Sequence, residues 1–250
     1  MPETIRLFVD ADLSAGASLA LDTPQAHYLL NVLRRGAGDS LRLFNGRDGE
    51  WQARIESAGR GRCTVLVAER TAEQPSGESD LWLLFAPVKR APIDMIATKA
   101  TELGVSALWP VFTRHTAVTR VNSNRLRANA IEAAEQTGRL SVPEIMEPKS
   151  LGDVLASWPA DRSLMVCDET GAAPPIADAL KDQRAGKWAV LIGPEGGFAQ
   201  SELDGLAKLP FVTRVGLGPR VLRADTAAIA ALACFQALAG DWRAPGGTRP

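Results

Sequence analysis

Two glycine-containing loops within residues 188–228 decide how the chain folds. The first loop follows an apolar strand, and the segment reads Trp188-Ala189-Val190-Leu191-Ile192-Gly193-Pro194-Glu195-Gly196-Gly197-Phe198. The second segment reads Phe211-Val212-Thr213-Arg214-Val215-Gly216-Leu217-Gly218-Pro219-Arg220-Val221-Leu222-Arg223-Ala224. Glycine lets backbone N–H and C=O groups approach a ligand, and loops at the carboxyl ends of adjacent strands form the crevice in which α/β sheets bind small molecules. The pair predicts a binding site, with plain turns as the alternative.

The two loops belong to a longer alternation of strands and helices. Strands are predicted at 81–86, 105–112, 164–167, 188–192 and 211–215, and helices at 93–103, 122–138, 175–181, from 201 onward and at 225–239. This rhythm is typical of a largely parallel sheet with helices on its faces. The last helix is apolar nearly all round and therefore has to be buried, which favours a homodimer interface.

The N-terminal part has a different rhythm. Short strands are predicted at 6–9, 40–44, 50–55 and 63–68, with one helix at 24–35, and they indicate a small barrel. Residues 72–80 are polar and acidic, which is linker composition. The sequence therefore predicts a β-barrel domain at 1–71, a linker at 72–80, an α/β domain at 81–243 and a loose tail at 244–250.

Composition limits the class of protein. The 250 residues are 46% apolar and 23% charged, as in ordinary globular proteins. The cysteines, Cys63, Cys167 and Cys234, are odd in number and scattered, which suits reduced thiols in a cytosol better than disulfides or zinc. We find no signal-peptide pattern and no stretch long enough to cross a bilayer. A cytoplasmic protein without membrane association is expected.

Charge is informative only locally, because 28 basic and 29 acidic residues nearly cancel. Between 89 and 127 only two acidic residues, Asp94 and Glu102, accompany the basic ones, which are Lys89, Arg90, Lys99, Arg114, Arg120, Arg125 and Arg127. Such an excess favours contact with a phosphate backbone, with a solvated basic face as the alternative. Arg34 and Arg35 either contact phosphate or cap a helix end.

Few other side chains suggest chemistry. The candidates are Glu195, Arg220, Arg223, Asp225 and the run 135–139. His115 follows a strand alone and is interpreted as structural, and no histidine has a partner at metal-ligand spacing, so no metal site is predicted. Neither a hydrolase triad nor a phosphate-binding Gly-Lys-Ser/Thr loop is found, so hydrolytic functions are disfavoured.

Five motifs in the same order resemble the RsmE family, SPOUT-class RNA methyltransferases that modify uridine N3 in 16S ribosomal RNA. They are His27 with 32–34, Lys89 with 99–105, 135–139 with 142–145, and the two glycine loops at 193–198 and 217–227. The resemblance covers almost the whole chain. It implies a PUA-like β-barrel followed by a SPOUT domain with a C-terminal trefoil knot, one of the exceptions to unknotted chains.

The resemblance also implies ligands and residues. S-adenosylmethionine would be held in the knot by Leu191, Gly193, Pro194, Glu195, Gly196, Gly197, Leu217, Gly218, Arg220, Val221, Leu222 and Ala227. The small ribosomal subunit and its 16S rRNA would be contacted by Arg34, Arg35, Lys89, Arg114 and Arg139, and the enzyme would be a homodimer. Two departures stand out: Asp225 replaces the family's glutamate, and 114–116 read Arg-His-Thr where the family has Glu-Arg-Ser.

The expected catalytic residues follow from the chemistry of uracil. Loss of the N3 proton puts negative charge on O2 and O4, and a guanidinium nearby would stabilise that anion. Arg223 is the first choice, while Arg139 or Arg220 would bind phosphate or the flipped nucleotide. Glu195 or Asp225 either accepts the proton or serves only to anchor a loop or cap a helix. A ribose 2′-O-methyltransferase, a non-catalytic rRNA-binding assembly factor and a phosphate-binding hydrolase are the competing functions.

Overall fold

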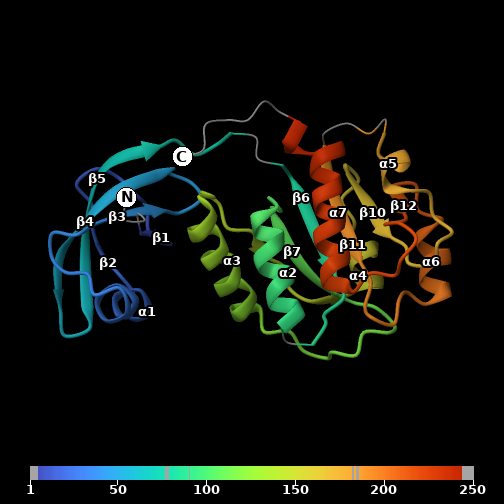
Figure 1. The fold of residues 1–250 in the computed structure, drawn as a ribbon, viewed down its shortest axis with the longest axis horizontal. Coiled ribbons are helices and arrows are strands. Elements are labelled where there is room, and N and C mark those ends of the chain that lie inside the picture. The colour runs from blue at the N-terminus through green and yellow to red at the C-terminus, as the bar shows by residue number, and fades with distance from the viewer. Residues whose placement is uncertain (1–4, 77–78, 90, 182, 184–185, 244–250) are drawn as a thin grey trace. The chain divides into compact units, whose positions relative to one another are not determined.

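The computed structural model describes residues 5–76, 79–89, 91–181, 183 and 186–243 (Figure 1). Arg90 and the predicted tail at 244–250 lie outside the described residues. The described residues form two compact units, one with 5–76 and 134–142, the other with the remainder. The segment 134–142, which the sequence assigned to the second domain, thus falls in the first unit. The sequence-based boundaries stay a prediction.

The first unit is built on one five-stranded sheet. Its elements are β1 (Arg6–Phe8), β2 (Ser18–Ala20), α1 (Thr23–His27), the π-helix η1 (Tyr28–Val32), β3 (Ser40–Phe44), β4 (Glu50–Gly59) and β5 (Arg62–Ala72). The strands lie in the order β1-β3-β4-β5-β2, with β1 parallel to β3 and the other pairs antiparallel. The apolar residues that alternate along these strands share one core. The predicted strands are confirmed, and β2 was missed.

The helical interruption of the first unit is shorter than predicted. Asp22 begins it, because its carboxylate accepts the Gln25 N–H at 2.7 Å while the Gln25 side chain accepts the Asp22 N–H. The helix ends at Val32, with Leu33 as its C-cap, and not at residue 35, since Arg34 has a left-handed φ of 54°. The Arg35 N–H then donates to the Leu29 carbonyl of the π-helix, at 2.8 Å. Backbone bonds therefore close this helix end, and the Arg34 side chain is exposed.

The side chain of Arg6 explains why residues 134–142 belong to the first unit. Its Nη1 donates to the carbonyls of Ala134 at 2.8 Å and Glu135 at 3.1 Å, and its Nη2 donates to that of Arg139 at 3.1 Å. The Phe8 N–H donates to the Glu135 carboxylate at 2.9 Å. The residues at the end of a helix have carbonyls without helical partners, and here Arg6 supplies the donors.

A fully buried carboxylate neutralises Arg6. The side chain of Glu50 is 0% exposed and accepts from Arg6 Nε at 2.8 Å, Arg42 Nη1 at 2.7 Å and the Thr71 hydroxyl at 2.9 Å. Burial raises the pKa of Glu50, but the hydrogen bonds from Arg6 and Thr71 and the two positive charges outweigh it, so the pKa lies below its ordinary value. Glu50 is therefore an ionised group on which the position of 134–142 depends.

The second unit contains a seven-stranded parallel sheet. Its strands are β6 (Leu81–Phe85), β7 (Ala107–Phe112), β8 (Glu144–Ile145), β9 (Lys149–Ser150), β10 (Arg162–Cys167), β11 (Lys187–Ile192) and β12 (Val212–Val215). They lie in the order β12-β10-β11-β6-β7-β8, with β9 also paired to β7, and every pair is parallel. The predicted parallel sheet is confirmed, although the short strands β8 and β9 were missed.

Helices cover both faces of this sheet. They are α2 (Ala91–Glu102), α3 (Ser123–Thr137), α4 (Leu151–Ala156), α5 (Ile176–Ala179), α6 (Gln200–Leu206) and α7 (Ala224–Leu238), followed by the 3₁₀ turn η2 (Asp241–Arg243). Side chains of α2, α5 and α7 share a core with one face, and those of α4 and α6 with the other. The missed α4 and the shorter α5, predicted to reach residue 181, are corrections to the sequence-based elements.

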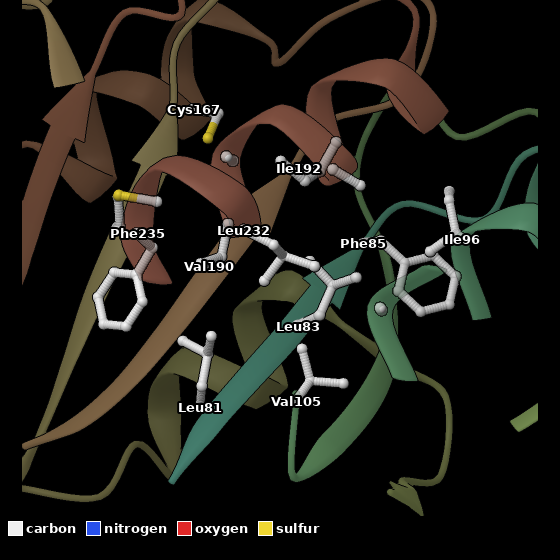
Figure 2. Close-up of a cluster of buried hydrophobic side chains, with 14 of the residues drawn as sticks. Leu81, Leu83, Phe85, Ile96, Val105, Cys167, Val190, Ile192, Leu232 and Phe235 are labelled. Atoms are coloured by element: carbon white, nitrogen blue, oxygen red, sulfur yellow. The ribbon is translucent and has the colours of Figure 1, made fainter. Parts of the chain in front are cut away.

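The helix α7 is buried mainly against its own sheet. Figure 2 shows Leu232 and Phe235 of α7 beside Leu83 of β6 and Val190 of β11. Within the described chain, its residues Thr226 and Ala237 are exposed, and several others are half-buried. Packing on the sheet and on α2 accounts for most of its apolar composition. The homodimer predicted from this helix stays a prediction.

The order of the strands sets the place of a ligand site. From β10 the chain passes through α5 to β11 on one side, and then through α6, on the opposite face, to β12 on the other side of β10. The order of the strands therefore reverses at β10. Such a switch point is where open α/β sheets form a ligand crevice. Of the helices described, none is both long and apolar enough to cross a membrane.

Candidate functional site

A cavity of about 470 Å³ lies at this switch point. Its walls come from the loop after β10, the loop after β12 and one residue of α7. The lining residues are Asp168, Glu169, Thr170, Gly171, Ala173, Pro175, Gly216, Leu217, Gly218, Pro219, Arg220, Val221, Leu222 and Ala227. The volume and the concave shape suit a ligand of nucleoside size.

The second glycine loop forms one whole wall of the cavity. Six residues predicted to bind the cofactor are brought together there: Leu217, Gly218, Arg220, Val221, Leu222 and Ala227. Gly218 has a φ of +102°, a conformation that favours glycine, and an added Cβ would meet open space. Along 217–222 the described residues provide no acceptor for a backbone N–H. This wall can therefore offer several N–H donors to a ligand.

Gly216 joins the two loops that form the cavity. Its N–H donates to the Pro174 carbonyl at 2.8 Å, and its carbonyl accepts the Ile176 N–H at 3.1 Å. A Cβ at Gly216 would lie 3.2 Å from the Ala173 carbonyl oxygen, closer than most side chains allow. A side chain at this position would push against the neighbouring loop, so glycine is favoured here.

The loop after β10 was missed by the sequence analysis. Asp168 lies at the end of the strand with a fully buried side chain that accepts the Thr170 N–H at 2.8 Å and pairs with Arg214 of β12, whose Nε lies at 3.0 Å. Burial raises the pKa of Asp168, but the bonds from Thr170 and the Arg214 charge outweigh it and lower the pKa below its ordinary value. An acidic pair followed by Thr170 and Gly171, directly after a buried strand, is the signal that was available.

The first glycine loop stands apart from the cavity wall. None of its predicted cofactor residues is among those that line the cavity, namely Leu191, Gly193, Pro194, Glu195, Gly196 and Gly197. Leu191 is fully buried in the core, and a Cβ at Gly193 would lie 2.9 Å from the Phe198 ring. Glu195 is exposed. Their role in cofactor binding stays a prediction.

Side chains from two other loops hold the first glycine loop. His115 Nδ1 lies 3.2 Å from the Gly196 carbonyl oxygen and 3.1 Å from that of Gly197. Since carbonyls only accept hydrogen bonds, Nδ1 must carry a proton and donate. On the other side, the Glu169 carboxylate accepts the Phe198 N–H at 2.8 Å. His115, interpreted as structural from the sequence, makes structural contacts here.

The predicted catalytic residues are only partly brought together. Arg223 precedes α7 with a side chain that is 76% exposed, and its Nε lies 3.7 Å from Asp225 Oδ1. Asp225 also accepts the N–H of Thr226 at 2.9 Å. In the part of the chain that is described, no hydrogen bond or ion pair joins Glu195 to either residue. Arg223 and Asp225 thus form one pair, and Glu195 is separate.

The predicted RNA-binding residues are spread over both units. Arg34 and Lys89 are exposed, and Arg35 is half-buried. Arg139 donates to the Ser141 hydroxyl at 3.0 Å. Arg114 contacts the start of α6, since its N–H donates to Glu202 at 2.9 Å and its Nη1 to Ser201 at 3.3 Å. These positions alone do not define one RNA surface.

Comparisons with known proteins identify both parts of the chain. Residues 75–236 match the RNA methyltransferase domain, and residues 21–68 match the RNA methyltransferase PUA domain. The chain is 33% identical over 234 residues to the ribosomal RNA small subunit methyltransferase E of Rickettsia conorii, covering 91% of this chain and 93% of that one.

Solved structures agree with these matches. The methyltransferase E of Neisseria gonorrhoeae, bound to S-adenosyl methionine, has a TM-score of 0.86 at 26% identity, covering 96% of this chain and all of that one (100%). A Legionella pneumophila methyltransferase in complex with the cofactor has a TM-score of 0.83 at 29% identity, covering 94% and 98%.

The predicted α/β fold of the SPOUT class with an N-terminal PUA-like domain is confirmed by these matches. The trefoil knot that the resemblance implies stays a prediction. With a matched domain over more than half of the chain and a relative above 30% identity along nearly its whole length, the chain belongs to the RsmE family, the ribosomal RNA small subunit methyltransferases E.

Proposed function

We propose that the protein is an S-adenosylmethionine-dependent methyltransferase that methylates N3 of a uridine in the 16S rRNA of the small ribosomal subunit. The observation that carries the proposal is the cavity at the switch point, whose second glycine loop offers N–H donors. Two solved relatives, from Neisseria and Legionella, hold S-adenosylmethionine. The base specificity rests on the resemblance of the sequence motifs to the RsmE family.

The residues of the cavity fit this cofactor. Leu217, Val221, Leu222 and Ala227 provide an apolar wall suited to a purine, and the backbone of 217–222 provides donors for its ring nitrogens. When bound, S-adenosylmethionine supplies a methyl group activated by its positive sulfonium. We propose that the first glycine loop, Gly193 to Gly197, contributes through its backbone to the same site.

The remaining task for the chain is to align the base and manage one proton. Holding two groups in a reactive geometry can supply about 7–11 kcal/mol of the barrier. Arg223 is proposed to stabilise the negative charge that develops on O2 and O4 of the uracil. The carboxylate of Asp225, 3.7 Å from Arg223 Nε, orients that guanidinium. Asp225 or Glu195 is the proposed proton acceptor.

Contacts with RNA are proposed for Arg34, Arg35, Lys89, Arg114 and Arg139. The neighbourhood of Arg34 supports this on the first unit, because the side chains of Tyr28 and Val32, in the preceding π-helix, are 38% and 57% exposed. An exposed aromatic ring in the same short segment as an exposed arginine suits single-stranded RNA, which stacks its bases and needs positive charge along its backbone.

Changes at Tyr28 and Arg34 test this contact. Tyr28→Ala is expected to weaken binding to small-subunit RNA about 10-fold through lost stacking. Arg34→Ala is expected to weaken binding and to lower the slope of log affinity against log salt by about 1. The measurement is filter binding at several salt concentrations. Arg60→Ala is the control, since Arg60 is exposed and also has a left-handed φ, of 50°. An equal loss for Arg60→Ala would contradict the assignment.

We also infer that the enzyme acts in the cytoplasm as a homodimer. The cytoplasm follows from the proposed rRNA substrate. The homodimer is supported by the resemblance and by two large apolar side chains exposed on the second unit, Val221 and Trp242, at 81% and 56%. Sedimentation velocity that shows only monomers at micromolar concentration would reject the dimer.

The proposed reaction is tested by tritium transfer from labelled S-adenosylmethionine to small subunits that lack the modification. Nuclease digestion and mass spectrometry then identify the methylated nucleoside, and N3-methyluridine is the expected product. A 2′-O-methylated nucleoside would replace the proposal by ribose methylation. Cofactor binding without transfer to subunits or naked rRNA would reject the substrate, and absence of cofactor binding would favour an RNA-binding assembly factor.

A further inference from the structure

Glu169 is the carboxylate on the cavity wall that no cation neutralises within the described chain. The other acidic residue of the wall, Asp168, is paired with Arg214. For Glu169 the structure gives one polar contact, the N–H of Phe198, at 2.8 Å from Oε1. No described residue donates to Oε2. A negatively charged acceptor beside a ligand cavity is thus left available.

The first glycine loop fixes the direction of this carboxylate. An ideal Cβ on Gly197 would lie 2.2 Å from Glu169 Oε1 and 3.1 Å from its Cδ, so the carboxylate occupies the space that a side chain at 197 would need. Gly197 also has a left-handed φ of +69°. The absence of a side chain at Gly197 therefore leaves the space that the Glu169 carboxylate occupies. Through this contact the first glycine loop is connected to the cavity, although none of its residues lines the cavity wall.

The backbone of the turn that contains Glu169 is held in place by contacts of the preceding residue, Asp168. The Asp168 side chain accepts the Thr170 N–H at 2.8 Å and is anchored to β12 by Arg214. The backbone on both sides of Glu169 is thus fixed by the buried Asp168 carboxylate, and the carboxylate of Glu169 by the Phe198 N–H. A group held in this way loses little conformational freedom when it binds a ligand.

The chemistry of the cavity indicates which part of a ligand it binds. A carboxylate accepts from hydroxyl or ammonium groups. In α/β sheets that bind dinucleotides, an acidic residue accepts from a ribose hydroxyl beside the strand ends. The apolar part of the wall, Leu217, Leu222 and Ala227, suits a purine, and the ribose is the polar group joined directly to it. Of the two carboxylate oxygens, Oε2 is the one to which no described residue donates, and it is available to accept from a hydroxyl.

We propose that Glu169 binds the ribose hydroxyls of S-adenosylmethionine and so connects the first glycine loop to the cofactor. This assignment rests on the proposed function. Replacing the carboxylate by an amide, in Glu169→Gln, removes a charge-assisted acceptor, which is expected to weaken cofactor binding about 10- to 100-fold. The amide oxygen of the introduced glutamine would still accept the Phe198 N–H, so the loop is expected to keep its position.

Calorimetry with three ligands on Glu169→Gln tests the assignment. S-adenosylmethionine and S-adenosylhomocysteine contain adenine, ribose and an amino acid, whereas 5′-methylthioadenosine lacks the amino acid. Contact with the ribose predicts that all three lose affinity by a similar factor. The control is Asp204→Asn on α6, which removes one exposed negative charge and should leave all three affinities unchanged.

Three other results would each reject a specific part of the proposal. Unchanged binding of all three ligands by Glu169→Gln would reject a role for Glu169. Loss confined to the two ligands with an amino acid would assign the carboxylate to their ammonium group and reject the ribose contact. If the wild-type protein binds no S-adenosylmethionine, the proposed function itself fails, which is distinct from failure of the variant alone.

Hydrogen exchange separates ligand binding from loop structure. Glu169→Ala removes the acceptor of the Phe198 N–H and is expected to speed amide exchange in 193–198, whereas Glu169→Gln is expected to exchange like wild type. Weak binding by Glu169→Gln with wild-type exchange supports direct contact. Weak binding accompanied by fast exchange in the loop would reject it in favour of a structural role.

Discussion

Arg223→Ala is expected to lower kcat about 100- to 1,000-fold while the affinity for S-adenosylmethionine stays near that of the wild type. The size is that of losing one donor that stabilises an oxyanion in the transition state. The side chain of Arg223 is 76% exposed and its described ion-pair contact is with Asp225, so its removal leaves no cavity in the core. Single-turnover methyl transfer at saturating cofactor and RNA measures the effect on the chemical step.

Two further variants show whether the guanidinium acts through its charge and what Asp225 does. Arg223→Lys keeps the charge but loses the planar fork, and partial recovery is expected. Asp225→Asn retains the Oδ1 that accepts the Thr226 N–H. A small loss for Asp225→Asn would indicate orientation of Arg223, and a loss as large as that of Arg223→Ala would indicate the proton acceptor. Near-normal turnover of Arg223→Ala would show that another residue stabilises the uracil anion.

Glu50→Gln is expected to lower the free energy of unfolding of the first unit by about 3–5 kcal/mol. Breaking a buried ion pair leaves the other charge without compensation, and here the Arg6 side chain, 10% exposed, would keep a buried guanidinium. Glu56→Gln is the matched control, because it makes the same change at an exposed position of the same strand, β4. Hydrogen exchange of the strand peptides in urea measures the loss. Equal effects of the two variants would contradict the role of Glu50.

The lowered pKa of Glu50 predicts how the stability of the first unit depends on pH. Because the pKa of Glu50 in the folded chain is lowered, its stabilisation is fully present above the ordinary glutamate pKa of about 4.3 and is lost as the pH falls through the lower folded value. The difference in unfolding free energy between wild type and Glu50→Gln should therefore shrink below pH of about 4. A difference that stays constant down to pH of about 2 would contradict this linkage.

The sequence predicted those parts of the fold whose signals are local. Apolar strands followed by glycine located β11 and β12, and the loop 216–222, predicted to bind the cofactor, lines a cavity. Asn122 or Ser123 was expected to begin a helix, and the Asn122 side chain accepts the Arg125 N–H at 3.0 Å at the start of α3. In each case the information lies within a few neighbouring residues.

The order of strands in a sheet depends on contacts between residues that are far apart in the sequence. For this reason the loop after β10 was not predicted to line the cavity. Glu169 lies at the cavity because β10 lies between β11 and β12, an order that the sequence of residues 162–170 does not specify. The contact between Phe198 and Glu169 joins positions 29 apart. The glycines of the first loop show that something approaches the backbone but not what approaches it, so the contact of Glu169 with this loop was not predicted.

The first unit is built from two separate stretches of sequence, 5–76 and 134–142, so cutting the protein at the linker would divide that unit. A fragment that stops at the acidic linker would contain Arg6 and Phe8 but not the carbonyls of Ala134, Glu135 and Arg139 or the Glu135 carboxylate. Donors that are satisfied in the intact chain would lose their acceptors, and unsatisfied donors in buried positions weaken a fold. The PUA-like part is therefore not a self-sufficient module: a gene fusion or exchange that moved residues 1–76 alone would leave behind nine residues, 134–142, that complete it.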